Sequence, residues 1–127
     1  MDKRIIIPIE LYSSKNSRQI FRTGNGRTIV AKSKGAKQNE IDLENILPFK
    51  RVEFLELLAG KLKPYRIQFK IYRKTARRFD YVNIVQNLLD AMVTCRWLED
   101  DNADVMIPVF VPYQVDKYDP RVEIEVL

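Results

Sequence analysis

Hydrophobic and polar positions alternate most clearly in the middle of the chain. Between Tyr65 and Tyr72, apolar or aromatic residues take every second position and alternate with Arg66, Gln68 and Lys70. A period of two is typical of a strand that buries one face. We therefore predict a strand here with a cationic exposed face.

Two other segments repeat their apolar residues every three or four positions, as amphipathic helices do. The first runs from Pro48 to Ala59 and is followed by Gly60, a helix stop signal. The second runs from about Tyr81 to Arg96, with Asp80 in the position of an N-cap. Its apolar stripe consists of Ile84, Leu88, Ala91, Met92 and Cys95. The opposite side of this second helix is polar and carries Asn83, Gln86, Asn87 and Asp90.

The rest of the chain predicts short strands joined by polar connections. We expect strands over Ile5 to Leu11, Arg27 to Ala31, Val105 to Val111 and Val122 to Leu127. We expect a polar loop over residues 12–26, a mobile connection over 32–45 and an acidic turn over 98–104. The order of elements predicts one α+β domain over residues 1–127, with a mixed or antiparallel sheet and two main helices.

Composition excludes several classes of function. A chain of 127 residues with 46% hydrophobic content fits a single core. It has no histidine, so histidine-dependent nucleases, Ser-His triads and histidine-ligated zinc are excluded. Its one cysteine, Cys95, cannot form an internal disulfide, and this favours a reducing compartment, for which we predict the cytoplasm. No apolar run is long enough to predict a signal peptide or a membrane span.

Charge is segregated along the chain although the net charge is only +5. Residues 1–37 carry nine basic and two acidic residues, and residues 61–78 carry eight basic residues and no acidic one. Residues 38–60 and 79–127 are acidic overall. A basic block that meets an acidic one suits a protein that attracts phosphates and places carboxylates among them. Charge alone favours the simpler interpretation, two ordinary solvated surfaces.

Acidic and amide residues gather where the second helix begins. Asp80 starts the helix, Asn83 follows one turn later, and an acidic cluster that includes Asp101 lies in the next loop. Such oxygen donors suit Mg²⁺ or Mn²⁺, which can activate water for phosphodiester hydrolysis beside arginines. Asp80 equally fits a plain helix cap, and the acidic loop an ordinary turn.

Helix geometry limits which of these groups can share an ion. Asn83 and Asp90 lie seven residues apart, roughly 10 Å along the axis, so they cannot bind the same ion directly. Asp101 stands about five residues beyond the helix end, and an extended chain of that length returns roughly 16 Å. We therefore expect Asp80 and Asp101 to meet, with Asp90 outside the direct ligands or facing substrate.

The same stretch resembles the RusA-type Holliday junction resolvases, small phage and prophage endonucleases. Their signature is an arginine-rich approach, Asp-x-Asp-Asn, a helix with a lysine and an Asp-Ala pair, and an aromatic turn that ends in Asp-Asp. The chain matches it with Arg77-Arg78, Asp80, Asn83, Asp90-Ala91 and Trp97-Leu98-Glu99-Asp100-Asp101. A weaker similarity reaches the N-terminus through Ile7-Pro8-Ile9 and residues 13–21.

The resemblance implies a homodimeric endonuclease that uses Mg²⁺ or Mn²⁺ to resolve branched DNA in recombination and repair. Its catalytic residues would be Asp80, Asn83, Asp90 and Asp101, and its metal ligands Asp80, Asn83 and Asp101. The basic block predicts phosphate contacts, and the resemblance adds an N-terminal region that faces DNA. The predicted DNA-binding residues are Lys70, Arg73, Lys74, Arg77, Arg78, Lys15 and Arg18. For the dimer interface, Trp97 is the expected aromatic anchor, with core packing as its alternative.

Two positions depart from the family pattern. Val82 stands where the family has its second aspartate, and Gln86 where it has the helical lysine. The first change removes a metal ligand, and the second removes a fixed positive charge near the phosphate. The sequence therefore leaves three hypotheses open: an active endonuclease, a DNA-binding member of the same fold with impaired catalysis, and a structural phage protein unrelated to DNA.

Overall fold

One long strand organises the main sheet of the protein. The computed structural model describes residues 3–12, 18–22, 28–32 and 34–127, of which 18–22, 28–32 and 34 are described by their backbone alone. Strand β4 (Tyr65–Arg73) pairs antiparallel with β7 (Arg121–Val126) and parallel with β5 (Met106–Phe110). The sheet is therefore mixed, and the predicted α+β class is confirmed. The two strands predicted near the C-terminus are confirmed within one residue at each end.

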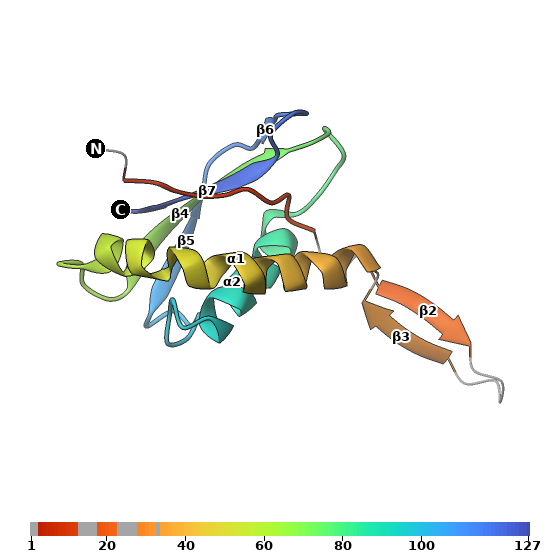
Figure 1. The fold of residues 1–127 in the computed structure, drawn as a ribbon, viewed down its shortest axis with the longest axis horizontal. Coiled ribbons are helices and arrows are strands. Elements are labelled where there is room, and N and C mark those ends of the chain that lie inside the picture. The colour runs from red at the N-terminus through yellow and green to blue at the C-terminus, as the bar shows by residue number, and fades with distance from the viewer. Residues whose placement is uncertain (1–2, 13–17, 23–27, 33) are drawn as a thin grey trace.

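Two short strands extend this sheet, and a separate ribbon lies outside it. Strand β1 (Ile5–Ile7) pairs with β7, and β6 (Gln114–Val115) continues beside the end of β4. Strands β2 (Arg18–Arg22) and β3 (Thr28–Lys32) pair only with each other. Figure 1 shows this ribbon extending away from the rest of the domain, beyond the start of the first helix.

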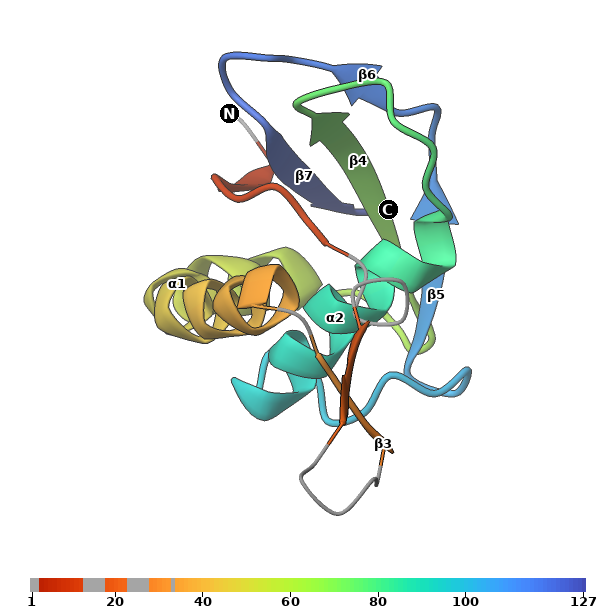
Figure 2. The same cartoon turned by 90° about the vertical axis from the view of Figure 1, so that its right-hand side faces the viewer.

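Both helices cover the same face of the main sheet. Helix α1 (Lys34–Leu58) and helix α2 (Tyr81–Thr94) pack against each other, and Figure 2 shows them together below the strands. The apolar face of β4, formed by Ile67, Phe69 and Ile71, is fully buried. No helix in the described part of the chain is both long and apolar enough to cross a membrane.

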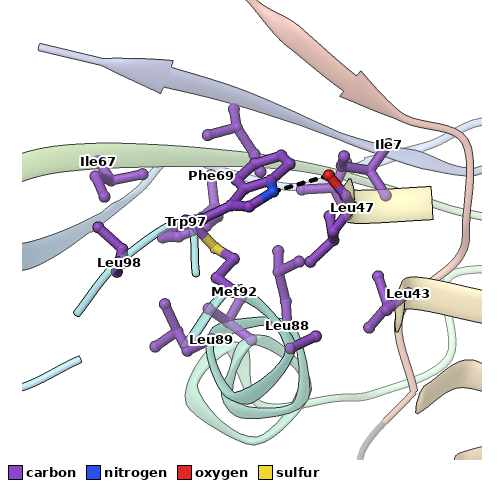
Figure 3. Close-up of a cluster of buried hydrophobic side chains, with 14 of the residues drawn as sticks. Ile7, Leu43, Leu47, Ile67, Phe69, Leu88, Leu89, Met92, Trp97 and Leu98 are labelled. Atoms are coloured by element: carbon purple, nitrogen blue, oxygen red, sulfur yellow. Dashed lines mark hydrogen bonds between the residues drawn. The ribbon is translucent and has the colours of Figure 1, made fainter. Parts of the chain in front are cut away.

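Trp97 lies at the centre of the core. Its ring is only 1% exposed, stacks on Phe54 at 4.6 Å between centroids, and donates a hydrogen bond to the Leu47 carbonyl at 2.8 Å. Figure 3 shows the ring enclosed by side chains from both helices and from β4. The expectation that Trp97 anchors a dimer interface was wrong, because the core of a single chain already buries it.

Helix α1 is much longer than its sequence pattern predicts. Residues 34–45, expected to belong to a mobile connection, form its first three turns. The prediction failed because one of the buried positions is polar. Asn39 is 2% exposed and donates to the Glu10 carbonyl at 2.7 Å, so a hydrogen bond compensates its burial.

The buried side of α1 also differs from the stripe that a helix over Pro48 to Ala59 predicts, with Phe49, Val52, Leu55 and Leu58 at every third position. Phe49 and Val52 are 87% and 67% exposed, while Leu47 and Phe54 face the core. Pro48, predicted as the start of the helix, lies inside it. Because α1 begins at Lys34, its buried side includes Leu43 and Leu47, which precede the predicted start of the helix.

The N-terminal strand predictions need similar corrections. Only Ile5–Ile7 of the expected strand over Ile5 to Leu11 pairs in the sheet, and Pro8 follows it. The expected loop over residues 12–26 contains β2, whose antiparallel register with β3 runs from Arg18↔Lys32 to Arg22↔Thr28. The remainder of that loop, residues 13–17 and 23–26, lies outside the described residues, and so does Arg27.

Candidate functional site

Helix α2 carries a polar stripe along its solvent side. Asp80 is the N-cap residue, as predicted, but its side chain makes no capping hydrogen bond. Instead its Oδ2 accepts a hydrogen bond from Nδ2 of Asn83 at 3.2 Å. Asp80 and Asn83 form the N-terminal half of the stripe, and their hydrogen bond keeps the Asp80 carboxylate on the exposed surface.

Gln86, Asp90 and Asp101 form the C-terminal half of the stripe. Nε2 of Gln86 donates to Oδ1 of Asp90 at 2.8 Å and to Oδ2 of Asp101 at 3.3 Å. One amide group thus bridges a carboxylate on α2 and a carboxylate from the following turn. Gln86 stands where the RusA pattern has a lysine, so a neutral donor replaces a charged one between two acids.

The turn that carries Asp101 is fixed by its own side chains. The Asp100 carboxylate accepts hydrogen bonds from the Asp101 backbone N–H and from Nδ2 of Asn102, each at 2.8 Å. These bonds, the backbone one first, lower the pKa of Asp100 below its usual value. The Asn102 side chain in turn accepts from the Asp104 N–H at 2.9 Å. The turn therefore presents Asp101 to α2 in a defined position.

The hydrogen bonds separate the residues that we expected to share one ion. Asp101 lies beside Gln86, which is six residues and about 9 Å along the helix axis from Asp80. The Asp101 carboxylate therefore accepts a hydrogen bond from Gln86, and the same Gln86 nitrogen donates to Asp90. The structure brings Asp101 together with Asp90, and Asp80 together with Asn83.

The available donors fit magnesium poorly. Mg²⁺ requires a nearly octahedral set of oxygens, but Gln86 turns its nitrogen, not its oxygen, toward both carboxylates. Val82 supplies no oxygen. Among the described residues, no three His, Cys, Asp or Glu side chains are close enough together to hold a metal ion. The magnesium or manganese cofactor stays a prediction that this arrangement does not favour.

Aromatic side chains surround the N-terminal half of the stripe. An open hollow of about 610 Å³ lies beside Asp80 and Asn83. Val82, where the RusA pattern has an aspartate, is 67% exposed at this hollow. The remaining lining residues are Phe79, Tyr81 and Phe110. We name this space the larger hollow.

A second space also borders Phe79 and Tyr81. This smaller hollow measures about 330 Å³ and is lined by Ala76, Arg78, Phe79, Tyr81 and Tyr113. The two hollows share the rings of Phe79 and Tyr81, which meet edge to face at 5.2 Å between centroids. Sequence reasoning missed these aromatic residues, although Phe79-Asp80-Tyr81 directly precedes the helix and was a visible signal.

Contacts with Arg73 and with the Tyr113 backbone fix the orientation of the Phe79 and Tyr81 rings. The Arg73 guanidinium lies 4.7 Å from the Phe79 ring centroid and donates through Nη1 to the Leu11 carbonyl at 2.7 Å. The Tyr81 hydroxyl accepts a hydrogen bond from the Tyr113 backbone N–H at 2.8 Å. Such contacts fix the orientation of a ring before any ligand arrives.

Arg73 was predicted to bind DNA, and its position argues against that role. The side chain is 8% exposed, and its Nε is buried with no hydrogen-bond partner in the described part of the chain. Its position on β4 continues the series of Ile67, Phe69 and Ile71, so Arg73 belongs to the buried side of the strand. There it packs against Phe79 instead of facing solvent.

The other predicted DNA contacts differ in accessibility. Lys74, Arg77 and Arg78 are exposed, and the Lys74 N–H donates to Glu10 at 2.5 Å. Lys70 is half-buried, with its ammonium 5.5 Å from the Tyr72 ring centroid. Lys15 lies outside the described residues, and Arg18 is described only by its backbone, at the start of β2. Among the predicted DNA contacts whose side chains the structure describes, the exposed ones therefore all lie within residues 74–78.

Comparison with known proteins gives no independent assignment. No known protein-family pattern matches the chain, and no curated protein matches it significantly.

Proposed function

We propose that the protein binds branched DNA at the N-terminal end of α2 and that it binds this DNA rather than cutting it efficiently. The observation that carries the proposal is the arrangement around Phe79. The exposed Arg77 and Arg78 directly precede Phe79, which lines both aromatic hollows. The carboxylates of Asp80 and Asp90 are hydrogen-bonded to side-chain amides. This combination suits nucleic acid better than it suits a metal ion.

The arginines supply the attraction for the phosphate backbone. Cations that contact phosphates release condensed counterions, so their contribution to affinity falls as salt increases. The Lys74 N–H is bound to Glu10, which anchors the start of segment 74–78 to the body of the domain. Arg77 and Arg78 are thus displayed from a segment with one fixed end.

The ribbon formed by β2 and β3 offers a second contact with DNA. A two-stranded ribbon has dimensions that fit the major groove. The chain has no acidic residue between Glu10 and Glu40, and the two strands contain Arg18, Arg22 and Lys32. Charge and shape together support a role for the ribbon as an arm that follows the DNA backbone.

An active endonuclease is the second candidate. Asp80, Asp90 and Asp101 keep the spacing of the RusA pattern, and Asp90 and Asp101 share a hydrogen-bond donor. A metal ion could use these carboxylates only after displacing the amide nitrogen of Gln86. For this reason we rank cutting below binding.

We also propose that the protein acts as a homodimer. A junction of four arms presents pairs of equivalent strands, and a twofold dimer matches them with two equal surfaces. Since one chain has a mass of 15.0 kDa, light scattering should give about 30 kDa. A mass that stays at the monomer value at micromolar concentration would contradict the dimer.

Replacing both exposed arginines tests the proposed DNA contact. The variant Arg77→Gln/Arg78→Gln should bind a synthetic four-way junction at least about tenfold more weakly in EDTA. The slope of log affinity against log salt should become less steep by up to roughly 2. Both values can be measured by fluorescence anisotropy at several salt concentrations.

A matched control removes the same charge from the other end of β4. Lys61 and Arg66 are exposed, so Lys61→Gln/Arg66→Gln keeps the fold and the net charge of the test variant. It should retain most of the affinity. Equal losses in the two variants would show a general charge effect, and no binding by the parent protein would refute the proposed function.

A further inference from the structure

We propose that the larger hollow holds an unpaired nucleobase of the bound DNA, with an adenine preferred over a purine that lacks its exocyclic amino group. The inference rests on the proposed DNA binding and adds what is recognised at that site. It follows from three features of the hollow: its apolar walls, its hydrogen-bond acceptors and its position beside the arginines.

The walls of the larger hollow suit a flat, apolar ring. Phe79, Tyr81 and Phe110 are half-buried, and Tyr81 lies 5.2 Å from each of the other two between ring centroids. Val82 adds an apolar rim that is 67% exposed. A solvated magnesium site gains nothing from such walls, whereas a base that leaves its stack recovers stacking and apolar contact.

The rings are also prearranged for this task. Arg73 lies against Phe79, and the Tyr81 hydroxyl is bound to the Tyr113 N–H. A binding surface that is already ordered loses little conformational entropy when a ligand arrives. The burial of Arg73, which excludes it from phosphate contact, is explained by this support of Phe79.

The polar edge of the hollow presents hydrogen-bond acceptors. Asn83 uses its amide nitrogen to donate to Asp80, which leaves its amide oxygen as an acceptor beside the carboxylate. Two acceptors favour a base with an exocyclic amino donor, such as adenine. Unsubstituted purine has the same ring system without that amino group, so it would offer the carboxylate no hydrogen-bond donor.

Arginine side chains are available to bind the phosphates next to the base. Arg78 lines the smaller hollow, which shares Phe79 with the larger one, and Arg77 precedes Arg78 in the exposed segment. A nucleotide with its base in the larger hollow would place its backbone near these guanidinium groups. Unpaired bases occur at branch points and bulges, so the hollow would select such structures over continuous duplex.

The test compares DNA duplexes that differ only at one unpaired position. Anisotropy in EDTA should show the protein binding a duplex with a bulged adenine roughly 5- to 100-fold more tightly than one with an abasic bulge. A bulged unsubstituted purine should bind more weakly than adenine, and Asp80→Asn should reduce that difference because an amide can donate to ring N1.

Two valine variants separate the loss of base binding in the larger hollow from the general effect of an added negative charge. Val82→Glu should abolish the advantage of the bulged base, because it places a carboxylate on the apolar rim. Val52→Glu on α1 is the control, since Val52 is also 67% exposed and neither change disturbs the core. Phe79→Leu should reduce the same advantage, and thermal unfolding identifies any loss of fold.

Each outcome separates the inference from the proposed function. If the parent protein binds junctions but does not distinguish bulged adenine from an abasic bulge, the hollow does not hold a base, although DNA binding stands. The same conclusion follows if Val82→Glu and Val52→Glu have equal effects. If no DNA binds at any salt concentration, the proposed function itself fails.

Discussion

The two halves of the polar stripe on α2 have similar side chains but different surroundings. The N-terminal half, Asp80 and Asn83, lines the larger hollow together with aromatic residues. The C-terminal half, Gln86, Asp90 and Asp101, is a set of acids joined through one amide. The sequence pattern treats both halves as parts of one magnesium site, but their hydrogen bonds divide them.

The difference shows that acidic spacing alone does not define a metal site. Two single residues determine the chemistry of this surface. Val82 makes the rim of the N-terminal half apolar, and Gln86 donates to the carboxylates of the C-terminal half. An apolar rim favours a flat organic ligand, and the Gln86 amide satisfies carboxylates that would otherwise attract a cation.

The largest expected effect concerns the support of the N-terminal half. Arg73→Leu should lower the free energy of unfolding by about 2–3 kcal/mol, because the Leu11 carbonyl loses its donor and Phe79 loses its cation. Urea unfolding followed by circular dichroism measures this loss. The exposed Arg66 on the same strand provides the control Arg66→Leu, which should change stability by less than about 0.5 kcal/mol. Equal effects would mean that Arg73 has no special supporting role.

A smaller effect is expected in the C-terminal half, where the contacts are exposed to solvent. Gln86→Glu replaces the bridging donor with a third carboxylate and should reduce stability by about 0.5 kcal/mol. Gln86→Lys should instead raise it by a few tenths, since an ammonium group then lies between two acids. Both stability differences should become smaller in high salt, which thermal unfolding can measure. Shifts of the same sign would argue against an electrostatic origin.

Sequence reasoning succeeded where local pattern decides the structure. The alternation along Tyr65 to Tyr72 predicted β4, and the helical stripe from Tyr81 predicted α2 with Asp80 at its start. It failed for the first half of α1, because Asn39 is a polar residue in a buried position whose partner, Glu10, is distant in sequence. No local pattern reveals such a contact.

For the candidate site, the positions on α2 could be predicted from the sequence, but the contacts made by the following turn could not. Helical spacing correctly predicted Gln86 and Asp90 on the exposed side of α2, but it also predicted Asn87 there, which is 3% exposed and donates to Asn39 at 3.1 Å. The neighbour of Asp101 could not be read from spacing, because it depends on how the turn over residues 98–104 folds back. The burial of Arg73 could have been predicted from the alternation, because Arg73 continues the buried series of Ile67, Phe69 and Ile71, but the run of cations around it suggested phosphate contact instead.

Incubating the parent protein with a labelled four-way junction, first in EDTA and then in Mg²⁺ or Mn²⁺, tests the central claim most directly. The account predicts salt-dependent binding in EDTA and little or no cleavage after metal is added. It further predicts that Val82→Asp/Gln86→Lys, which restores the RusA pattern, cleaves faster than the parent. Efficient metal-dependent cutting by the parent, abolished by Asp80→Asn or Asp101→Asn, would contradict the account and establish the endonuclease instead.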